Sequence, residues 1–474
     1  MTASVRRAGA PRHGVVVGGS IAGLLAARAL VDHVERVTVL DRDDLPRAPV
    51  TRGGVPQGRH VHGLLDRGRE LLEGWFPGLT DDLVAQGARL GDPGETGVWC
   101  FRPEPLAPSS TGMQALLVSR PLLEWYVRLR LLQDGRVEIR EDSSVLDVAF
   151  SQDETRIVGV VVADRDGGTP ALVPAQLVVD ASGRNSRTTE WLERRGYFAP
   201  PEEVRRIDKR YATHRVRPVG DGAAPLAVAV AARPGVPRSG IMLAQEKGEY
   251  VVSLVGRGGV QPPLAWPEFV SFARTLAAPA LADALAGMRP LDAGATYRFP
   301  ANRRRRWERA ARLPEGLVVT GDAFCVFDPV FGQGMTVAAI EAAALGRCLA
   351  EGGDRLAERF HGAAADVVDN PWTIAVGGTP DEHGGVPFPE RVIKGYLDRY
   401  LQAASSAPDL AAAFLRVSHL HGSPRELLAP RRALRVATVL ARDALRPTAR
   451  THRGIAAPHR PAPPGANVPI GEAR

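Results

Sequence analysis

Cysteine is scarce in this chain of 474 residues, and the three present, Cys100, Cys325 and Cys348, lie far apart in the sequence. An odd, dispersed set excludes a disulfide framework and a cysteine-ligated zinc site. We therefore expect a reducing, cytoplasmic location. Long apolar runs are also missing, since none reaches the roughly 20 residues that a membrane-spanning helix needs. We expect no integral membrane segment.

Lysine is nearly absent as well: only Lys209, Lys247 and Lys394 occur, although the formal net charge is +7. Arginine supplies the other positive charges and is spread along the chain. Because nucleic-acid binding needs a clustered basic patch, we expect no nucleic-acid partner. The tight run Arg303 to Arg306 is expected to be a solvated or ion-paired face, with a cofactor phosphate as the alternative contact.

A nucleotide-binding fingerprint lies near the start of the chain. The apolar strand Val15 to Val17 runs into the turn Gly18 to Gly23, and an alanine-rich helix follows. Glycines in such a turn let the backbone approach a pyrophosphate at the helix N-terminus, where free N–H groups favour anions. A second strand, Arg36 to Leu40, ends at Asp41, where an acid should meet a ribose hydroxyl. Ser20 replaces the second glycine of the usual G-x-G-x-x-G pattern.

Three further segments extend this pattern. A buried strand at 317–320 feeds Gly321-Asp322-Ala323, and Pro329 and Gly332-Gln333-Gly334 follow before a helix that begins at Met335. A strand ending in Asp180-Ala181-Ser182-Gly183 returns to the nucleotide sheet. A helix over 121–132 has Ser119 as its expected N-cap.

Together these segments resemble the class A flavoprotein monooxygenases, the FAD-dependent aromatic hydroxylases and polyene epoxidases with the para-hydroxybenzoate hydroxylase fold. The resemblance runs from Gly14 to about Leu445. The loop Arg52 to Gly63 and the Pro371-Trp372 segment look most like the bacterial polyether and terpenoid epoxidases. The resemblance implies an α/β fold: a Rossmann-type FAD-binding domain with an inserted mixed sheet-plus-helix substrate domain and C-terminal helices.

The resemblance also implies which residues hold the cofactor. Asp322 matches the aspartate that binds the ribityl chain, and Arg120 matches the arginine that reaches the FAD diphosphate. The helix end beside Gly334 and Met335 would favour the reduced, anionic flavin. Ser182 stands at the aspartate position of a motif that serves FAD and NADPH, with Asp180 upstream of it. The expected cofactor-binding residues are Gly18, Gly19, Ser20, Ala22, Gly23, Asp41, Arg42, Gln57, His60, Arg120, Asp180, Gly183, Asp322, Pro329, Gly332, Gly334 and Met335.

The chemistry implied by the resemblance is carried by the cofactor. NADPH or NADH reduces FAD, oxygen adds at the flavin C4a position, and the outer oxygen passes to an electron-rich carbon of a bulky apolar small molecule in natural-product biosynthesis. Epoxidation needs no side-chain base, whereas phenol hydroxylation benefits from one. We assign no catalytic residue and favour an epoxidase. For His60 and His62 we expect a flavin-lining or structural role, with acid–base work as the alternative.

Two other functions stay open: a flavin-dependent alkene reductase similar to geranylgeranyl reductase, and a non-catalytic flavin-binding protein. The pattern of flavin halogenases, a lysine in the N-terminal half and a Trp-x-Trp-x-Ile-Pro stretch, is poorly matched, since no lysine precedes Lys209 and no Trp-x-Trp occurs. Expected partners are the substrate and O2, in a monomer or homodimer. Arginines along the helix over 430–445 leave peripheral membrane contact as an alternative to surface packing. His419 and His421 have metal-like spacing without a nearby third ligand, so we expect no metal site.

The expected organisation follows from these segments. The FAD-binding domain spans 12–190 and 315–365, the substrate domain 191–314, a C-terminal helical region 366–445, and a disordered tail 446–474. Within them we expect single helices over 64–75 and 266–288, one strand over 171–179, and a mobile loop over 43–63.

Overall fold

The computed structural model describes residues 12–164, 168–220, 224–377 and 388–445. A five-stranded parallel sheet, in the order β17-β10-β1-β2-β6, forms the nucleotide-binding half. Its strands are β1 (His13–Val17), β2 (Arg36–Leu40), β6 (Val137–Arg140), β10 (Leu177–Asp180) and β17 (Leu317–Val319). The valine-rich central strand β1 is buried along its whole length, as expected for a parallel sheet covered on both faces.

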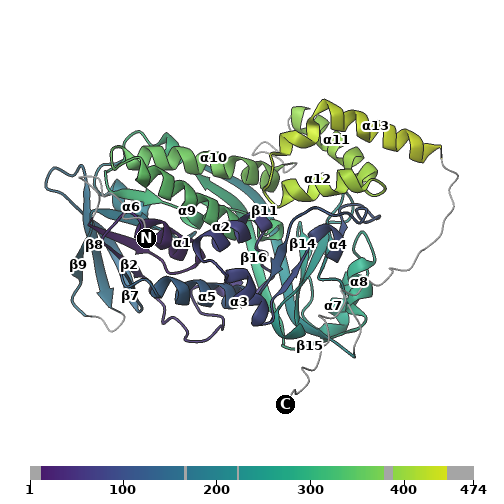
Figure 1. Cartoon of the computed structure of the whole chain (residues 1–474), viewed down its shortest axis with the longest axis horizontal. Helices are drawn as coiled ribbons and strands as arrows, with labels where there is room; N and C mark the ends of the chain where they lie inside the picture. Colours follow the sequence, from purple (N-terminus) through teal and green to yellow (C-terminus); the bar gives the residue numbers. More distant parts are fainter. Residues whose placement is uncertain (1–11, 165–167, 221–223, 378–387, 446–474) are drawn as a thin grey trace, which may run out of the picture.

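Helices cover one face of this sheet and a small sheet packs near its other side. The helices are α1 (Ile21–Val31), α5 (Arg120–Leu132), α9 (Gly334–Ala350) and α10 (Leu356–Val376), and the small antiparallel sheet comprises β7 (Ser143–Phe150), β8 (Ile157–Asp164) and β9 (Ala171–Pro174). α9 lies between α1 and α10 (Figure 1). The apolar side chains of these layers form one continuous core, so the distant segments 12–190 and 315–365 fold together.

The second sheet has eight strands, in the order β18-β16-β11-β14-β13-β12-β4 with β15 beside β11. Its strands are β4 (Gly97–Cys100), β11 (Glu202–Pro218), β12 (Ala227–Val230), β13 (Arg238–Ala244), β14 (Tyr250–Arg257), β15 (Met288–Pro290), β16 (Ala295–Arg305) and β18 (Cys325–Val326). One face packs against α7 (Trp266–Ala273) and α8 (Ala280–Leu285). The other face lies toward the nucleotide-binding half, so the two halves meet along β11 and β16 (Figure 1).

The C-terminal helices α11 (Phe388–Ala404), α12 (Pro408–Ser418) and α13 (Pro430–Ala444) share a separate core around Tyr400 and Leu410. In Figure 1 these helices lie above the second sheet, at the same edge of the molecule as α10. The remaining helices and strands are α2 (Asp66–Trp75), α3 (Leu79–Ala85), β3 (Arg89–Gly91), α4 (Pro93–Thr96), β5 (Ala115–Leu117) and α6 (Thr188–Glu193). Across the described residues, no helix combines the length and apolarity needed to cross a bilayer.

The expected fold class is confirmed, with differences in single elements. Ser119 caps α5 as predicted, since its hydroxyl accepts the Leu122 N–H at 3.3 Å. The single helix over 266–288 is wrong: Pro279 precedes α8 and cannot continue a helix from α7. The strand over 171–179 is also wrong, because the chain turns after Pro174 and forms β9 and β10.

Two elements cross the expected domain limits. The unpredicted α10 runs through the boundary between 365 and 366 and packs on α9. β4 lies in the first segment of the chain but pairs with β12 of the second sheet. The loop over 43–63 contains a 3-10 turn at Pro56–Arg59. The predicted tail over 446–474 lies outside the described residues.

Candidate cofactor site

The turn after β1 has the geometry of a phosphate-binding turn. Gly18 has φ +103, and a Cβ there would lie 2.6 Å from the Ala181 carbonyl oxygen. A Cβ on Gly23 would lie 1.7 Å from the Gly18 carbonyl oxygen. Only glycine fits either position, because no neighbouring backbone can give way. The chain therefore turns tightly into α1.

Ser20, at the position of the missing glycine, leaves the helix N-terminus free. Its side chain does not cap α1. The hydroxyl instead accepts a hydrogen bond from Arg120 Nη2 at 2.7 Å and donates one to Glu124 Oε2 at 3.1 Å. The first N–H groups of an uncapped helix attract an anion, so a diphosphate fits here. Arg120 Nε lies 3.7 Å from Glu124 Oε2 and makes no hydrogen bond among the described residues, so this N–H can still donate to a phosphate.

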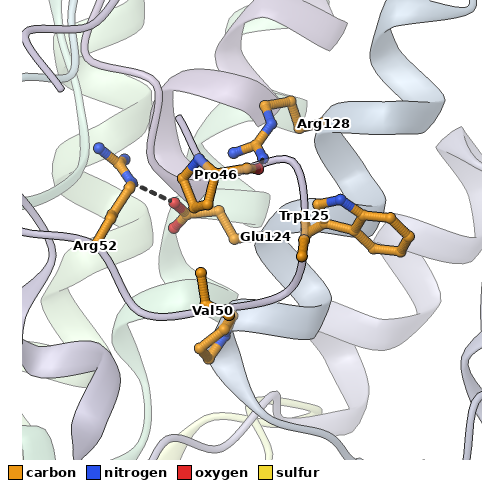
Figure 2. Close-up of a pocket in the computed structure, with 8 residues that line it drawn as sticks. Pro46, Val50, Arg52, Glu124, Trp125 and Arg128 are labelled. Carbon is orange, nitrogen blue, oxygen red and sulfur yellow. Dashed lines mark hydrogen bonds and ion pairs between the residues drawn. The ribbon is translucent and has the colours of Figure 1, made fainter. Parts of the chain in front are cut away.

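Asp41 is buried behind the turn. Its Oδ2 accepts the Gly19 N–H at 2.6 Å, and its Oδ1 accepts the Asp43 N–H at 2.9 Å and Arg52 Nη1 at 3.1 Å. A carboxylate oxygen accepts two hydrogen bonds, so Oδ2 can still accept a ribose hydroxyl. Arg52 also donates to Glu124 Oε1 at 3.0 Å, as Figure 2 shows.

Asp322 lies in a 3-10 turn, Gly321–Ala323, directly after β17. β17, β10 and β1 are parallel neighbours, so their carboxyl ends meet at one edge of the sheet, where α/β folds bind ligands. The Asp322 side chain is solvent-accessible although protein surrounds it. That surrounding protein raises the pKa of its carboxyl, and the nearby charges of Arg120 and Arg184 oppose the rise. The structure thus brings Arg120 and Asp322 close together.

Glu341 of α9 supports this turn, and the sequence argument missed it. Its Oε2 accepts the Thr320 hydroxyl at 2.7 Å and the Gly321 N–H at 2.7 Å. Burial raises the pKa of Glu341 to about 7. Glu341 could have been identified from the sequence as a single acidic residue in an alanine-rich, buried helix, because a buried carboxyl group needs a specific partner.

The loop before α9 is fixed to the second sheet through Asp328. Tyr211 donates to Asp328 Oδ1 at 2.6 Å, and Lys209 pairs with Oδ2. Asp328 Oδ1 also caps the Val330 N–H at 3.2 Å, at the start of the 3-10 turn Pro329–Phe331. Gly332 follows with φ +62, and open space lies beside Gly334. The predicted residues Pro329, Gly332 and Gly334 therefore stand in a braced loop next to the helix end.

Side chains of β11 and β16 face this loop. Tyr297 lies 5.9 Å from Tyr211 and 5.4 Å from His60 between ring centroids, and Arg184 donates to the Tyr297 hydroxyl at 2.7 Å. His60 Nδ1 lies 2.8 Å from the Thr213 hydroxyl. No sequence motif marks this region. Alternation along β11 places Lys209, Tyr211 and Thr213 on one face of the strand. This alternation is the sequence feature from which the face could have been predicted.

Burial keeps both loop histidines neutral. It lowers the pKa of His60 to about 4 and that of His62 to about 3, with Arg59 and Arg120 adding to the respective effects. His62 Nδ1 lies 3.0 Å from the His60 carbonyl oxygen. The expected lining or structural role fits these contacts better than acid–base work at neutral pH.

The other predicted residues are placed as follows. Asp180 is buried and accepts hydrogen bonds from Ser182, Ser186 and Thr188, so its side chain braces its own turn. Gly183 has φ +87 with open space beside it. Arg42 is exposed, Ala22 and Gln57 are half-buried, and Met335 is buried at the start of α9.

The arginine run is ion-paired, and two of its members are buried rather than solvated. Arg304 donates to Asp369 Oδ1 at 2.6 Å, which joins β16 to α10. Arg305 donates to the Ala323 carbonyl oxygen at 2.9 Å, beside Asp322. Arg306 pairs with Glu203 at 2.6 Å.

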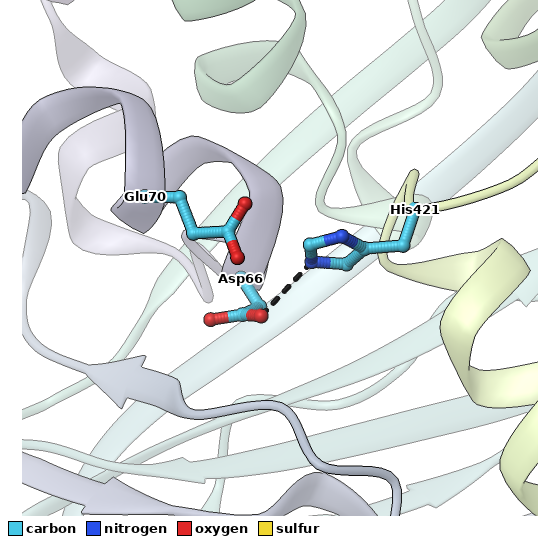
Figure 3. A group of neighbouring side chains, drawn as sticks. All are labelled: Asp66, Glu70 and His421. Carbon is cyan, nitrogen blue, oxygen red and sulfur yellow. Dashed lines mark hydrogen bonds and ion pairs between the residues drawn. The ribbon is translucent and has the colours of Figure 1, made fainter. Parts of the chain in front are cut away.

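His421 has neighbours that the sequence could not reveal. Its Nε2 lies 2.9 Å from Asp66 Oδ2, and Glu70 stands beside them on α2 (Figure 3). Arg69 Nε donates to Asp66 Oδ1 at 2.8 Å, and Arg67 pairs with Glu70 at 3.0 Å. Each of the two carboxylates thus has an arginine of α2 as an ion-pair partner. The group joins the C-terminal helices to α2.

Comparison with known proteins agrees with this geometry. Residues 13–358 match the family model described as FAD binding domain. The chain is 36% identical over 437 residues to Protein Rv3254 of Mycobacterium tuberculosis (strain ATCC 25618 / H37Rv), covering 86% of this chain and 90% of that protein. The flavin-dependent brominase Bmp2 has a similar fold, with a TM-score of 0.61 and 15% identity over 91% of this chain and 99% of that one. CabE, an aromatic hydroxylase from angucycline biosynthesis, also has a similar fold, with a TM-score of 0.54 and 16% identity over 86% of this chain and 76% of that one. The chain belongs to the FAD binding domain family and is an FAD-dependent oxidoreductase with the class A flavoprotein monooxygenase fold.

Proposed function

We propose that this protein is a monooxygenase that takes electrons from NADPH or NADH and transfers one oxygen atom of O2 to a bulky apolar small molecule, with epoxidation favoured over phenol hydroxylation. FAD supplies the electron transfer and oxygen activation when bound. The proposal rests on one juxtaposition: the Asp322 turn and the Pro329 to Gly334 loop both adjoin the aromatic face of the second sheet.

The residues of the site bind and position. The N-terminus of α1 and Arg120 would hold the diphosphate, Asp41 the ribose and Asp322 the ribityl chain. The N-terminus of α9 would offer N–H groups and positive potential to the flavin ring. Tyr297, which is partly exposed and is packed against the buried Tyr211, would form a wall against which a planar, apolar substrate packs.

Titration of the wall residues favours epoxidation. A general base works best with a pKa near the working pH. Burial lowers the pKa of His60 to about 4 and raises the pKa of Tyr211 and of Tyr297. Among the described residues on this face, none is poised to deprotonate a phenol near pH 7. An alkene substrate needs no such step.

The test is product labelling. The FAD-loaded protein is reduced anaerobically with NADPH, mixed with ¹⁸O2 and candidate polyenes or aromatics, and the products are analysed by mass spectrometry. We expect one ¹⁸O atom in the product and substrate-stimulated oxygen uptake. Reduction of an alkene without oxygen uptake would establish the alkene-reductase alternative. Flavin binding with no substrate-stimulated NADPH oxidation would indicate a non-catalytic flavin protein.

A further inference from the structure

Arg52 stands behind the phosphate-binding turn, outside the predicted cofactor residues. Its side chain is 7% exposed and reaches three carboxylates. Nη1 lies 3.1 Å from Asp41 Oδ1 and 2.8 Å from Asp43 Oδ2, and Nε lies 3.0 Å from Glu124 Oε1. Arg52 belongs to the glycine-rich loop, yet its guanidinium points toward Glu124 of α5 in the nucleotide-binding half (Figure 2).

Two hydrogen-bonded routes join Arg52 to the turn. In the first route, Asp41 Oδ1 accepts a hydrogen bond from Arg52 at 3.1 Å, and Asp41 Oδ2 accepts the Gly19 N–H at 2.6 Å. In the second route, Glu124 Oε1 accepts a hydrogen bond from Arg52 at 3.0 Å, and Glu124 Oε2 accepts the Ser20 hydroxyl at 3.1 Å. Both residues of the turn that would face a diphosphate are thus held by carboxylates that share one arginine.

We propose that Arg52 is a positioning residue of the cofactor site, which holds Asp41 and Glu124 in place and balances their charge so that the turn accepts an anionic dinucleotide. The inference rests on the proposed cofactor site and adds to it a residue that need not contact the ligand.

The physical reason is charge balance in a buried place. Asp41 and Glu124 each have a side chain 7% exposed. Glu124 also has Arg120, whose Nε lies 3.7 Å from Oε2, but Arg52 is the closer cation and the one that Asp41 shares. A buried carboxylate that loses its cation is strongly unfavourable. A diphosphate brings further negative charge to the same turn, and charges interact strongly away from water. Without Arg52, the pair Asp41 and Glu124 would repel the ligand that the turn and Arg120 attract.

The test measures FAD affinity of the apoprotein by quenching of flavin fluorescence, in wild type, R52Q, R52K, R52Q/E124Q and R47Q. We expect R52Q to weaken FAD binding at least about tenfold, since a buried charge loses its partner. R52K should weaken it less, roughly threefold, because a point charge cannot bridge three carboxylates. R52Q/E124Q should recover part of the loss, because it removes the negative charge of Glu124, which in R52Q would draw on Arg120 alone. R47Q removes an exposed arginine of the same loop and should match wild type.

The outcomes separate the alternatives. Equal FAD affinity in wild type and R52Q overturns the assignment of Arg52. So does a double variant that binds FAD no better than R52Q, since packing and not charge would then decide. If R52Q does not fold by circular dichroism, R52K decides, and wild-type affinity in R52K overturns the assignment. A wild-type protein without FAD affinity contradicts the proposed function itself.

Discussion

At the scale of single residues, the site depends on buried ionisable groups whose neighbours set their charge. Glu341 is fully buried beneath the Asp322 turn, and its pKa is raised from 4.5 to about 7 by burial. The folded protein therefore binds a proton that the unfolded chain releases near pH 4.5. The stability from this group is present below pH 4.5 and is lost as the pH rises through 7.

Replacing Glu341 by glutamine tests this assignment. Glutamine keeps an oxygen for the Thr320 and Gly321 donors but carries no charge. We expect E341Q to raise the free energy of unfolding by about 3 kcal/mol at pH 8 and by about 1 kcal/mol or less at pH 5. Urea titrations at the two pH values measure both. An equal gain at pH 5 and pH 8 would show that Glu341 is not held neutral by burial.

Sequence reasoning reached the residues whose roles follow from local spacing. Gly18, Gly23 and Asp41 lie in one strand-turn-helix-strand unit, so their order predicts their geometry. Arg52 and Tyr297 could not be found in this way. Each acquires its role from partners far along the chain, and such contacts depend on how the two halves pack.

At the scale of elements, the 3-10 turn Pro329–Phe331 is held by a buried pair. Asp328 is 2% exposed and takes its charge partner, Lys209, from β11. Removing one partner leaves a buried carboxylate, so we expect K209M to lower the free energy of unfolding by about 3 kcal/mol. K394M, on the exposed surface of α11, should change it by less than about 0.5 kcal/mol. Similar small effects in both variants, measured in urea, would contradict the role of Lys209 as an anchor.

Helix and strand limits could be predicted where periodicity and caps agree. α5 follows its Ser119 cap, and β2 matches the expected strand. The lengths of β11 and α10 could not be predicted. β11 continues through a bulge between Arg206 and Lys209, and α10 continues through Pro371. Packing against β16 and α9 overrides these local interruptions.

At the scale of the whole molecule, buried neutral histidines should make the fold sensitive to acid. Burial lowers the pKa of His361 and His62 to about 3 and that of His60 and His419 to about 4. The unfolded chain protonates histidine near pH 6.5. The contribution of these neutral histidines to the free energy of unfolding is therefore present above pH 6.5 and is lost as the pH falls toward 4. At pH 5 each histidine lowers the free energy of unfolding by about 2 kcal/mol.

One substitution isolates this effect. His361 Nε2 accepts the Val319 N–H at 3.0 Å, and a glutamine oxygen can replace that acceptor without titrating. We expect the loss of unfolding free energy between pH 7 and pH 5 to be smaller in H361Q by about 2 kcal/mol. An unchanged loss would mean that His361 is accessible to protons in the folded state.

The central claim is that chain segments far apart in sequence build one FAD site against the aromatic face of the second sheet. A crystal structure of the FAD complex tests it most directly. We predict the diphosphate at the N-terminus of α1 beside Arg120, the ribose at Asp41, the ribityl chain at Asp322, and the flavin ring between the Pro329 to Gly334 loop and the face that carries Tyr211 and Tyr297. A flavin ring away from that face, or a diphosphate away from α1, would contradict the account.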